Sequence, residues 1–169
     1  MKRPARSGFT LIELLLYVGI TSIILFAISL FFSVLLQSRI KSDTVTDVEQ
    51  QGAQAVLVMT QAIRNADAVN APLPGASASS LSLTTSSTGP SPTVFSLSGG
   101  ALTLTQGVAV PIALTNDRVI VSALTFTNLA RSGTPDIIRV SFVLTAVNAS
   151  GRAEYSYTQM FVGSAQKRP

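Results

Sequence analysis

The sequence predicts an α+β fold, in which one long N-terminal helix, membrane-spanning in its first half, packs against an antiparallel β-sheet head. Three observations predict this fold. A nearly uninterrupted apolar run follows a short basic start. An apolar stripe at three- and four-residue steps then continues the helical pattern. The rest of the 169 residues consists of short segments that alternate apolar and hydroxyl side chains between turn-forming residues.

The first element is a basic leader over residues 1–8, and the second is an apolar helix over residues 9–36. A secretory signal peptide begins in the same way, but residues 37–41 make a poor cleavage site. The 23 residues from Leu14 to Leu36 carry no charge, and at about 1.5 Å per residue they span roughly 34 Å, enough for a ~30 Å hydrocarbon core. We therefore expect a transmembrane helix whose hydroxyl groups bond back to the preceding turn.

The orientation of this helix follows from the basic residues beside it. Lys2, Arg3 and Arg6 precede the apolar run, which favours a cytoplasmic N-terminus, although Arg39 and Lys41 on the far side reduce the bias. We expect a single pass through the bacterial inner (cytoplasmic) membrane, with everything after about residue 38 outside the cytoplasm.

Glu13 is the single charged residue between Phe9 and Leu36. An unpaired carboxylate within an apolar span costs a few kcal/mol on insertion scales, so it marks a functional candidate. Cleavage between Gly8 and Phe9 would create an α-ammonium, and that of a neighbouring subunit could neutralise Glu13 and drive assembly in register. Alternatively, Glu13 lies at the headgroup boundary and is solvated there.

The sequence from Gly8 to Leu15, GFTLIELL, together with its basic leader and apolar run, resembles the type III signal of type IV pilins and pseudopilins. The resemblance implies that a prepilin peptidase in the membrane cuts after Gly8 and methylates the amine of Phe9. It assigns Glu13 to subunit docking. The implied partners are this peptidase, other pilin or pseudopilin subunits, the inner-membrane assembly platform and the lipid bilayer.

The helical pattern continues through residues 37–70, the soluble half of the same helix. Pro72 and Pro74 supply a stop, so one helix from about Phe9 to Asp67 is expected. Small residues within the stripe suggest a sheet lying close against it. The stripe comprises Val45, Val48, Gly52, Ala55, Met59, Ala62, Ala66 and Val69, widened by Val56 and Ile63.

The head is expected over residues 71–169. Gly99-Gly100 predicts a hairpin because both residues tolerate positive φ, and residues 148–151 predict a turn. Which face of the last two strands is buried remains open at this point. The expected strands cover residues 81–84, 94–97, 102–104, 118–127, 136–146 and 153–162.

The order of a long helix and then antiparallel strands also resembles pilins. Residues 112–121 and 124–126 resemble, more loosely, J-type minor pseudopilins of type II secretion and W-type minor pilins. The chain departs from many pilins because it lacks a C-terminal cysteine pair.

Composition excludes several classes of site. Without cysteine or histidine, the chain has no thiolate nucleophile, no usual zinc site and no Ser-His-Asp triad. We therefore expect no enzyme, no cofactor and no metal. Removing the three basic leader residues leaves nine basic against eight acidic residues, and nucleic-acid binding is not supported. Asn116, Asp117 and Asp136 offer oxygen ligands for Ca²⁺, but turn formation is the better interpretation, as it is for the glycosylation-like sequence at Asn148.

Two functions follow from these observations. The chain is expected to be a structural minor subunit of a type IV pilus, or of a pseudopilus that serves type II secretion or DNA uptake in competence. The alternative is a membrane-anchored β-domain binding protein that forms no filament.

Overall fold

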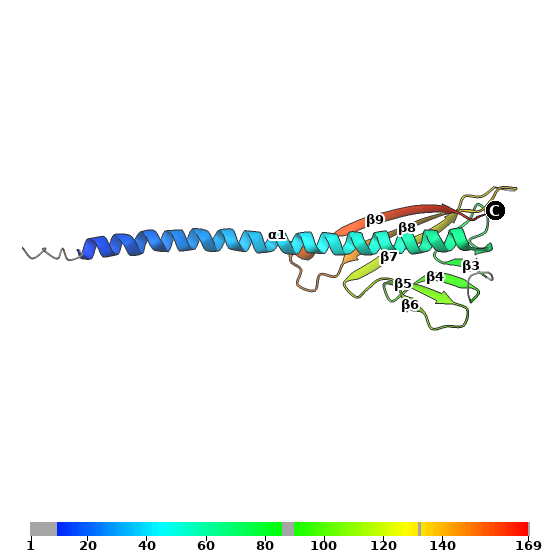
Figure 1. The fold of residues 1–169 in the computed structure, drawn as a ribbon, viewed down its shortest axis with the longest axis horizontal. Coiled ribbons are helices and arrows are strands. Elements are labelled where there is room, and N and C mark those ends of the chain that lie inside the picture. The colour runs from blue at the N-terminus through cyan, green and yellow to red at the C-terminus, as the bar shows by residue number, and fades with distance from the viewer. Residues whose placement is uncertain (1–9, 86–89, 132, 169) are drawn as a thin grey trace, which may run out of the picture. The chain divides into compact units, whose positions relative to one another are not determined.

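The computed structural model describes residues 10–85, 90–131 and 133–168. Gly8 and Phe9 therefore lie outside the described residues. The chain divides into two compact units, the first ending at Ile40 and the second beginning at Lys41. Helix α1, Leu11–Asn65, supplies both the described helix of the first unit and the helix of the second (Figure 1).

Helix α1 confirms the prediction of one continuous helix, with its ends at Leu11 and Asn65. No proline interrupts the sequence between these ends, and Arg64 in the last turn lies where the helix dipole favours a cation. The chain leaves the helix earlier than the expected end at Asp67, because the Asp67 N–H donates to the carbonyl of Thr84 at 2.8 Å. Residues 68–71 then form a strand.

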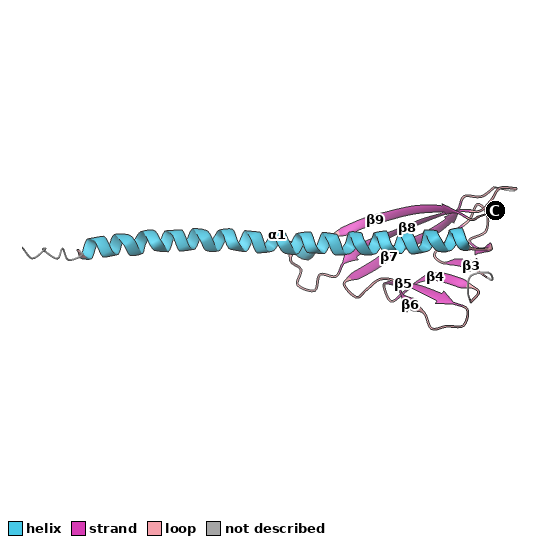
Figure 2. Cartoon of the chain, in the orientation of Figure 1, coloured by secondary structure: helices cyan, strands magenta, loops and turns pink. Residues whose placement is uncertain are grey.

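The head contains two antiparallel sheets beside the helical residues 41–65 (Figure 2). The predicted α+β fold, a long helix packed against an antiparallel β head, is therefore confirmed, with two sheets where one was expected. The first sheet has the order β1-β3-β4-β5-β6, with β1 Ala68–Ala71, β3 Leu81–Thr84, β4 Thr93–Ser98, β5 Ala101–Gln106 and β6 Ile112–Ala113. The second has the order β2-β7-β8-β9, with β2 Ser77–Ala78, β7 Val119–Asn128, β8 Ile137–Ala146 and β9 Thr158–Gln166.

The hairpin between β4 and β5 confirms the Gly99-Gly100 prediction. Ser98 faces Ala101 across the two strands, so the glycines alone form the turn. Their φ angles are 58° and 80°, in the left-handed region that residues with a side chain rarely adopt. The local sequence therefore determines this register.

The expected strand over residues 153–162 begins too early. Residues Ala153–Tyr155 form a short 3-10 helix (η1), and β9 begins at Thr158. Other contacts are made by the chain before β9: Arg152 pairs with Glu154, and Lys41 Nζ donates to the carbonyl of Ser156 at 2.5 Å. Tyr155 therefore lies on η1 and not on a strand.

The core of the head lies between the apolar stripe of α1 and the two sheets. Two residues of the predicted stripe lie beyond the end of α1. Ala66 is nevertheless buried, whereas Val69 lies on β1 and is half-buried. The sequence left open which face of β8 is buried, and the structure shows that it is the face that carries Ile138. The buried residues of α1 are Val48, Gly52, Ala55, Met59 and Ile63, and the largest buried strand residues are Leu81, Leu83, Phe95, Leu102, Phe126, Ile138, Phe142 and Leu144.

The helix and β9 approach each other closely at two glycines, as the small residues of the stripe predict. A Cβ atom on Gly52 would lie 2.2 Å from Cζ of Phe161, and one on Gly163 would lie 2.6 Å from Cγ1 of Val56. The ring of Phe161 also stacks on Phe142 of β8, with centroids 5.5 Å apart. Each element thus lacks a side chain where the other inserts one.

Candidate assembly and membrane-spanning segment

The described part of the N-terminal apolar segment, residues 10–36, begins with a helix cap at Thr10. The backbone N–H of Glu13 donates to Thr10 Oγ1 at 3.3 Å, and that of Leu14 donates to the Thr10 carbonyl at 3.2 Å. Thr10 and Glu13 occupy the first and fourth positions of a capping box. Sequence reasoning considered only the charge of Glu13, although this spacing already indicated a helix start.

The apolar run of α1 leaves its side chains exposed within the described chain. Large apolar residues from Leu11 to Leu36 are between 46% and 80% exposed, with Leu35 and Leu11 at the two limits. Soluble proteins seldom expose so large a contiguous apolar surface. By length and composition, α1 can cross a membrane. The run therefore needs lipid, or other apolar helices, around it.

The serine hydroxyls within this run are satisfied by the helix itself. Ser22 donates to the carbonyl of Val18 at 2.7 Å, and Ser29 to that of Leu25 at 2.9 Å. Ser33 donates to Leu30 at 2.8 Å. This confirms the expectation that these hydroxyls bond back to the preceding turn, so the serines add little cost in an apolar environment.

In the head, an amide pair ties the segment before β7 to α1. Gln51 Nε2 donates to Asn116 Oδ1 at 2.9 Å, and the Asn116 N–H donates to Gln51 Oε1 at 3.0 Å. The same Oδ1 accepts the N–H of Arg118 at 2.9 Å, which is the turn geometry expected of this asparagine. Arg118 also pairs with Asp47 at 3.3 Å. These contacts hold the head on the helix.

Asp136, another candidate oxygen ligand, and Asn148 of the glycosylation-like sequence also make structural contacts. Asp136 Oδ1 accepts a hydrogen bond from Nδ2 of the buried Asn128 at 2.9 Å, and the same Nδ2 reaches the carbonyl of Pro72 at 3.1 Å. Asn148 Nδ2 donates to the carbonyl of Arg152 at 2.9 Å, and Ser150 donates to Asn148 Oδ1 at 3.2 Å. Asn148 thus has the local bonding of a turn residue.

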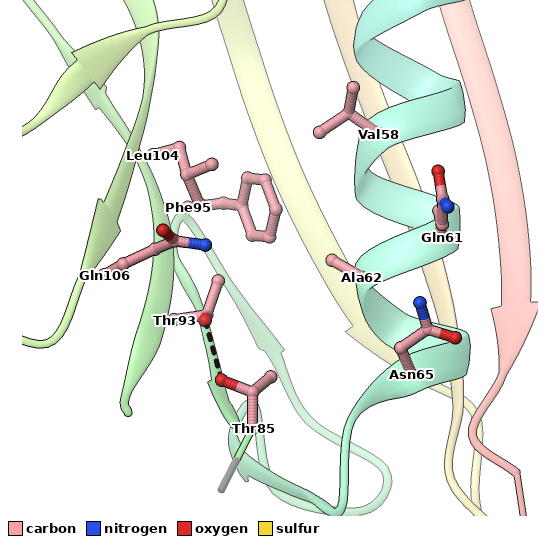
Figure 3. Close-up of a pocket in the computed structure, with 9 residues that line it drawn as sticks. All are labelled: Val58, Gln61, Ala62, Asn65, Thr85, Thr93, Phe95, Leu104 and Gln106. Carbon is pink, nitrogen blue, oxygen red and sulfur yellow. Dashed lines mark hydrogen bonds between the residues drawn. The ribbon is translucent and has the colours of Figure 1, made fainter. Parts of the chain in front are cut away.

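A hollow of about 220 Å³ lies between the end of α1 and the first sheet (Figure 3). Phe95 and Leu104 are on its sheet side, Val58 and Ala62 on its helix side. Amides and hydroxyls complete the lining, and Thr85 and Thr93 share a hydrogen bond of 3.0 Å. Among the described residues, no ionisable side chain lines this hollow, and its volume is below the ~300 Å³ at which small-molecule sites usually begin.

Comparison with known proteins bears on the N-terminal segment. Residues 3–29 match the family model described as the prokaryotic N-terminal methylation motif. The chain carries the signature of the type IV pilin and pseudopilin family. This pilin motif spans Gly8, Phe9 and Glu13, and it implies processing by a prepilin peptidase and assembly with other pilins. No curated protein and no solved structure matches this pilin-like chain.

Proposed function

We propose that this pilin-like chain is a structural, non-catalytic minor subunit of a type IV pilus, or of a pseudopilus that serves type II secretion or DNA uptake. The observation that carries the proposal is the exposed apolar run of α1, in which Glu13 is the single charge between Leu11 and Leu36. The J-type or W-type subtype belongs to the same proposal and is supported by the head sequence alone.

Before assembly, the run lies in the inner membrane as a single pass, with the N-terminus in the cytoplasm and the head outside. The prepilin peptidase cuts after Gly8, which converts the amide nitrogen of Phe9 into an α-ammonium, and then methylates it. The methylated amine stays cationic, so it can still pair with a carboxylate. The inner-membrane assembly platform would then receive the mature subunit.

In the filament, Glu13 of one subunit pairs with the N-terminal amine of a neighbour, while the apolar runs pack together. An unpaired carboxylate within such a core costs several kcal/mol, and a correctly staggered neighbour removes this cost. The pairing therefore selects one axial register.

A membrane-anchored binding protein without a filament is the second candidate. The hollow beside Phe95 favours it, because amide and hydroxyl groups surround an apolar floor there. Its small volume and lack of ionisable groups make it the weaker proposal.

Two measurements test the filament proposal. The intact mass of the chain extracted from membranes should show loss of residues 1–8 and gain of one methyl group. Glu13→Gln should be processed normally, yet its recovery in sheared filaments should fall roughly tenfold or more, because the ion pair is lost. Glu49→Gln makes the same chemical change on α1 in the head, and should assemble normally.

Two results would contradict the proposal. If the chain retains Met1 through Gly8 in cells with an active peptidase, then it is not cleaved as proposed. Normal incorporation of Glu13→Gln would remove the docking role.

A further inference from the structure

The connection from β5 into β6 exposes a continuous apolar segment, residues 108–113, which we call the 108–113 loop. Its sequence is Val-Ala-Val-Pro-Ile-Ala, and every one of these residues is exposed. Val108 is fully exposed, Val110 is 82% exposed and Ile112 is 61% exposed. Soluble proteins avoid runs of about four or more exposed apolar residues unless the run has a binding role. The loop is therefore a candidate contact surface of the head.

A proline limits how a partner can use this loop. β6 lies at the edge of the first sheet, and an edge strand can accept a further strand through its backbone groups. Pro111 directly precedes β6 and has no N–H to donate. The loop therefore offers its side chains to a partner, and not a continuous backbone edge.

The sequence around the loop carries no charge. From Ala68 to Asn116 there is no Asp, Glu, Lys or Arg, and this range includes every strand of the first sheet. Charged residues are depleted at the centre of protein interfaces, because an unpaired charge is costly to bury. The surface that receives the loop should therefore be uncharged as well.

The hollow beside Phe95 is an uncharged surface of this kind. Helix residues and sheet residues face each other across it (Figure 3). Its apolar floor can receive an aliphatic side chain, and the amides of Gln61 and Asn65 can bond to the backbone beside that side chain. Its volume of about 220 Å³ is small for a ligand site but has room for an aliphatic side chain.

The loop does not occupy the hollow of its own chain. Gln106 lines the hollow, whereas Val108, two residues later, is fully exposed. The loop and the hollow therefore adjoin each other at Gln106. If two copies face each other about a two-fold axis, each loop can enter the hollow of the other copy, so that the same contact is made twice.

We propose that the heads of two copies of this chain associate by inserting the 108–113 loop of each copy into the hollow beside Phe95 of the other. The contact involves the head alone. It therefore goes beyond the pairing of Glu13 that is proposed for the filament.

Cross-linking between two tagged copies tests the contact directly. The chain contains no cysteine, so introduced cysteines meet no competing thiol. Full-length Val108→Cys and full-length Gln61→Cys, each with a different tag, are produced in one membrane and treated with a short bis-maleimide linker. The expected product joins the two tags, which a cross-link within one chain cannot do.

Two matched controls define the background of this experiment. Gln54→Cys lies two helical turns before Gln61 and does not line the hollow, and Val147→Cys replaces an exposed valine of another loop. Val108→Cys with Gln54→Cys, or Val147→Cys with Gln61→Cys, should give at least about fivefold less product, because proximity raises the effective concentration of the two thiols. Equal yields, or no product from positions 108 and 61, would overturn the contact.

A charge placed in the loop tests whether the loop is buried. Val110→Asp in the Val108→Cys chain should lower the yield about tenfold, because its carboxylate would enter the uncharged hollow unpaired. Val110→Thr keeps the branched shape without a charge and should retain most of the yield. Similar losses in both variants would overturn insertion into the hollow.

Glu13→Gln in both chains separates this inference from the proposed function. The cross-link should persist, because the contact lies within the head. Its loss would show that the heads meet only within the filament, and would overturn a contact that they make by themselves. A cross-link from Val108→Cys to another pilin subunit, with none to a second copy, would overturn the second copy as the partner.

Discussion

The backbone of Glu13 makes an observed contact, and its carboxylate is the group proposed to act in assembly. Its backbone N–H is held by the side chain of Thr10 at the start of α1. Its carboxylate lies in the first turn, where the helix dipole favours a negative charge, and is the group proposed to meet a neighbour's amine. Glu13→Gln keeps the N–H and the side-chain shape, so it removes the charge while preserving the cap. This is why glutamine is a cleaner substitution than alanine.

The ionisation of Tyr157 links the stability of the head to pH. Partial burial of the ring raises the pKa of its hydroxyl above 10.0, and the nearby Glu49 carboxylate raises it further. The folded head therefore binds this proton more tightly than the unfolded chain does. It follows that the stability of the head falls as the pH rises from 10 through the folded pKa.

The absorbance titration of the phenol groups tests this shift. The chain has three tyrosines, so the difference between the wild-type curve and that of Tyr157→Phe isolates one hydroxyl. Its midpoint should lie above 10.0, and Glu49→Gln should lower it by removing the repelling charge. A midpoint that Glu49→Gln leaves unchanged would show that the carboxylate has no influence on this group.

The packing of α1 on β9 determines how the second sheet is held. Gly52→Val would drive two methyl groups into the ring of Phe161, which is itself stacked on Phe142. We expect a loss of about 1–3 kcal/mol of unfolding free energy, measured by thermal unfolding followed by circular dichroism. Ala53→Val, one residue along on the exposed face, should cost no more than about 0.7 kcal/mol of helix propensity. Similar losses in both variants would contradict the close approach.

Long periodic elements were predictable, and short ones were not. The 55-residue helix and the ten-residue strands β7 and β8 repeat their apolar period often enough to be read from sequence. Strands β2 and β6 have two residues each, which is too few to show any period. Alternation also tells which face of a strand is buried but not which strand lies beside it. The division into two sheets therefore depends on contacts that the sequence does not reveal.

The candidate site also has one part that the sequence reveals and another part that it does not. The Gly8, Phe9 and Glu13 pattern is local, so the sequence alone is enough to propose it. The Gln51–Asn116 amide pair joins residues 65 positions apart, and Lys41 meets Ser156 across 115 positions. Such contacts arise from the way α1 lies on the sheets. No spacing of residues indicates them.

The whole chain keeps its buried core within the second unit. Every buried residue of the hydrophobic core follows Val48 or is Val48 itself, and the described residues before Lys41 contribute none. We therefore expect the head to fold without the apolar run, but not without the first helical turns that follow it.

Two truncated chains test this division. A chain that begins at Gln37 should be soluble and should keep the unfolding free energy within about 0.5 kcal/mol of the full chain. A chain that begins at Glu49 lacks Lys41, the Asp47–Arg118 pair and the fully buried Val48, and should lose roughly 2–4 kcal/mol. Equal stability of the two chains would show that these helical residues do not hold the head.

Gly52 of α1 and Gly163 of β9 fix the axial position of the helix on the strand. If the helix slid by one turn, about 5.4 Å, the ring of Phe161 would meet Val48 or Val56 in place of Gly52, and Val56 would lose the gap at Gly163. Sliding in either direction is thus blocked by side-chain bulk. The two sheets therefore hold the same stretch of helix, around Gly52 and Val56, in every copy of the chain, so each copy presents the same head surface.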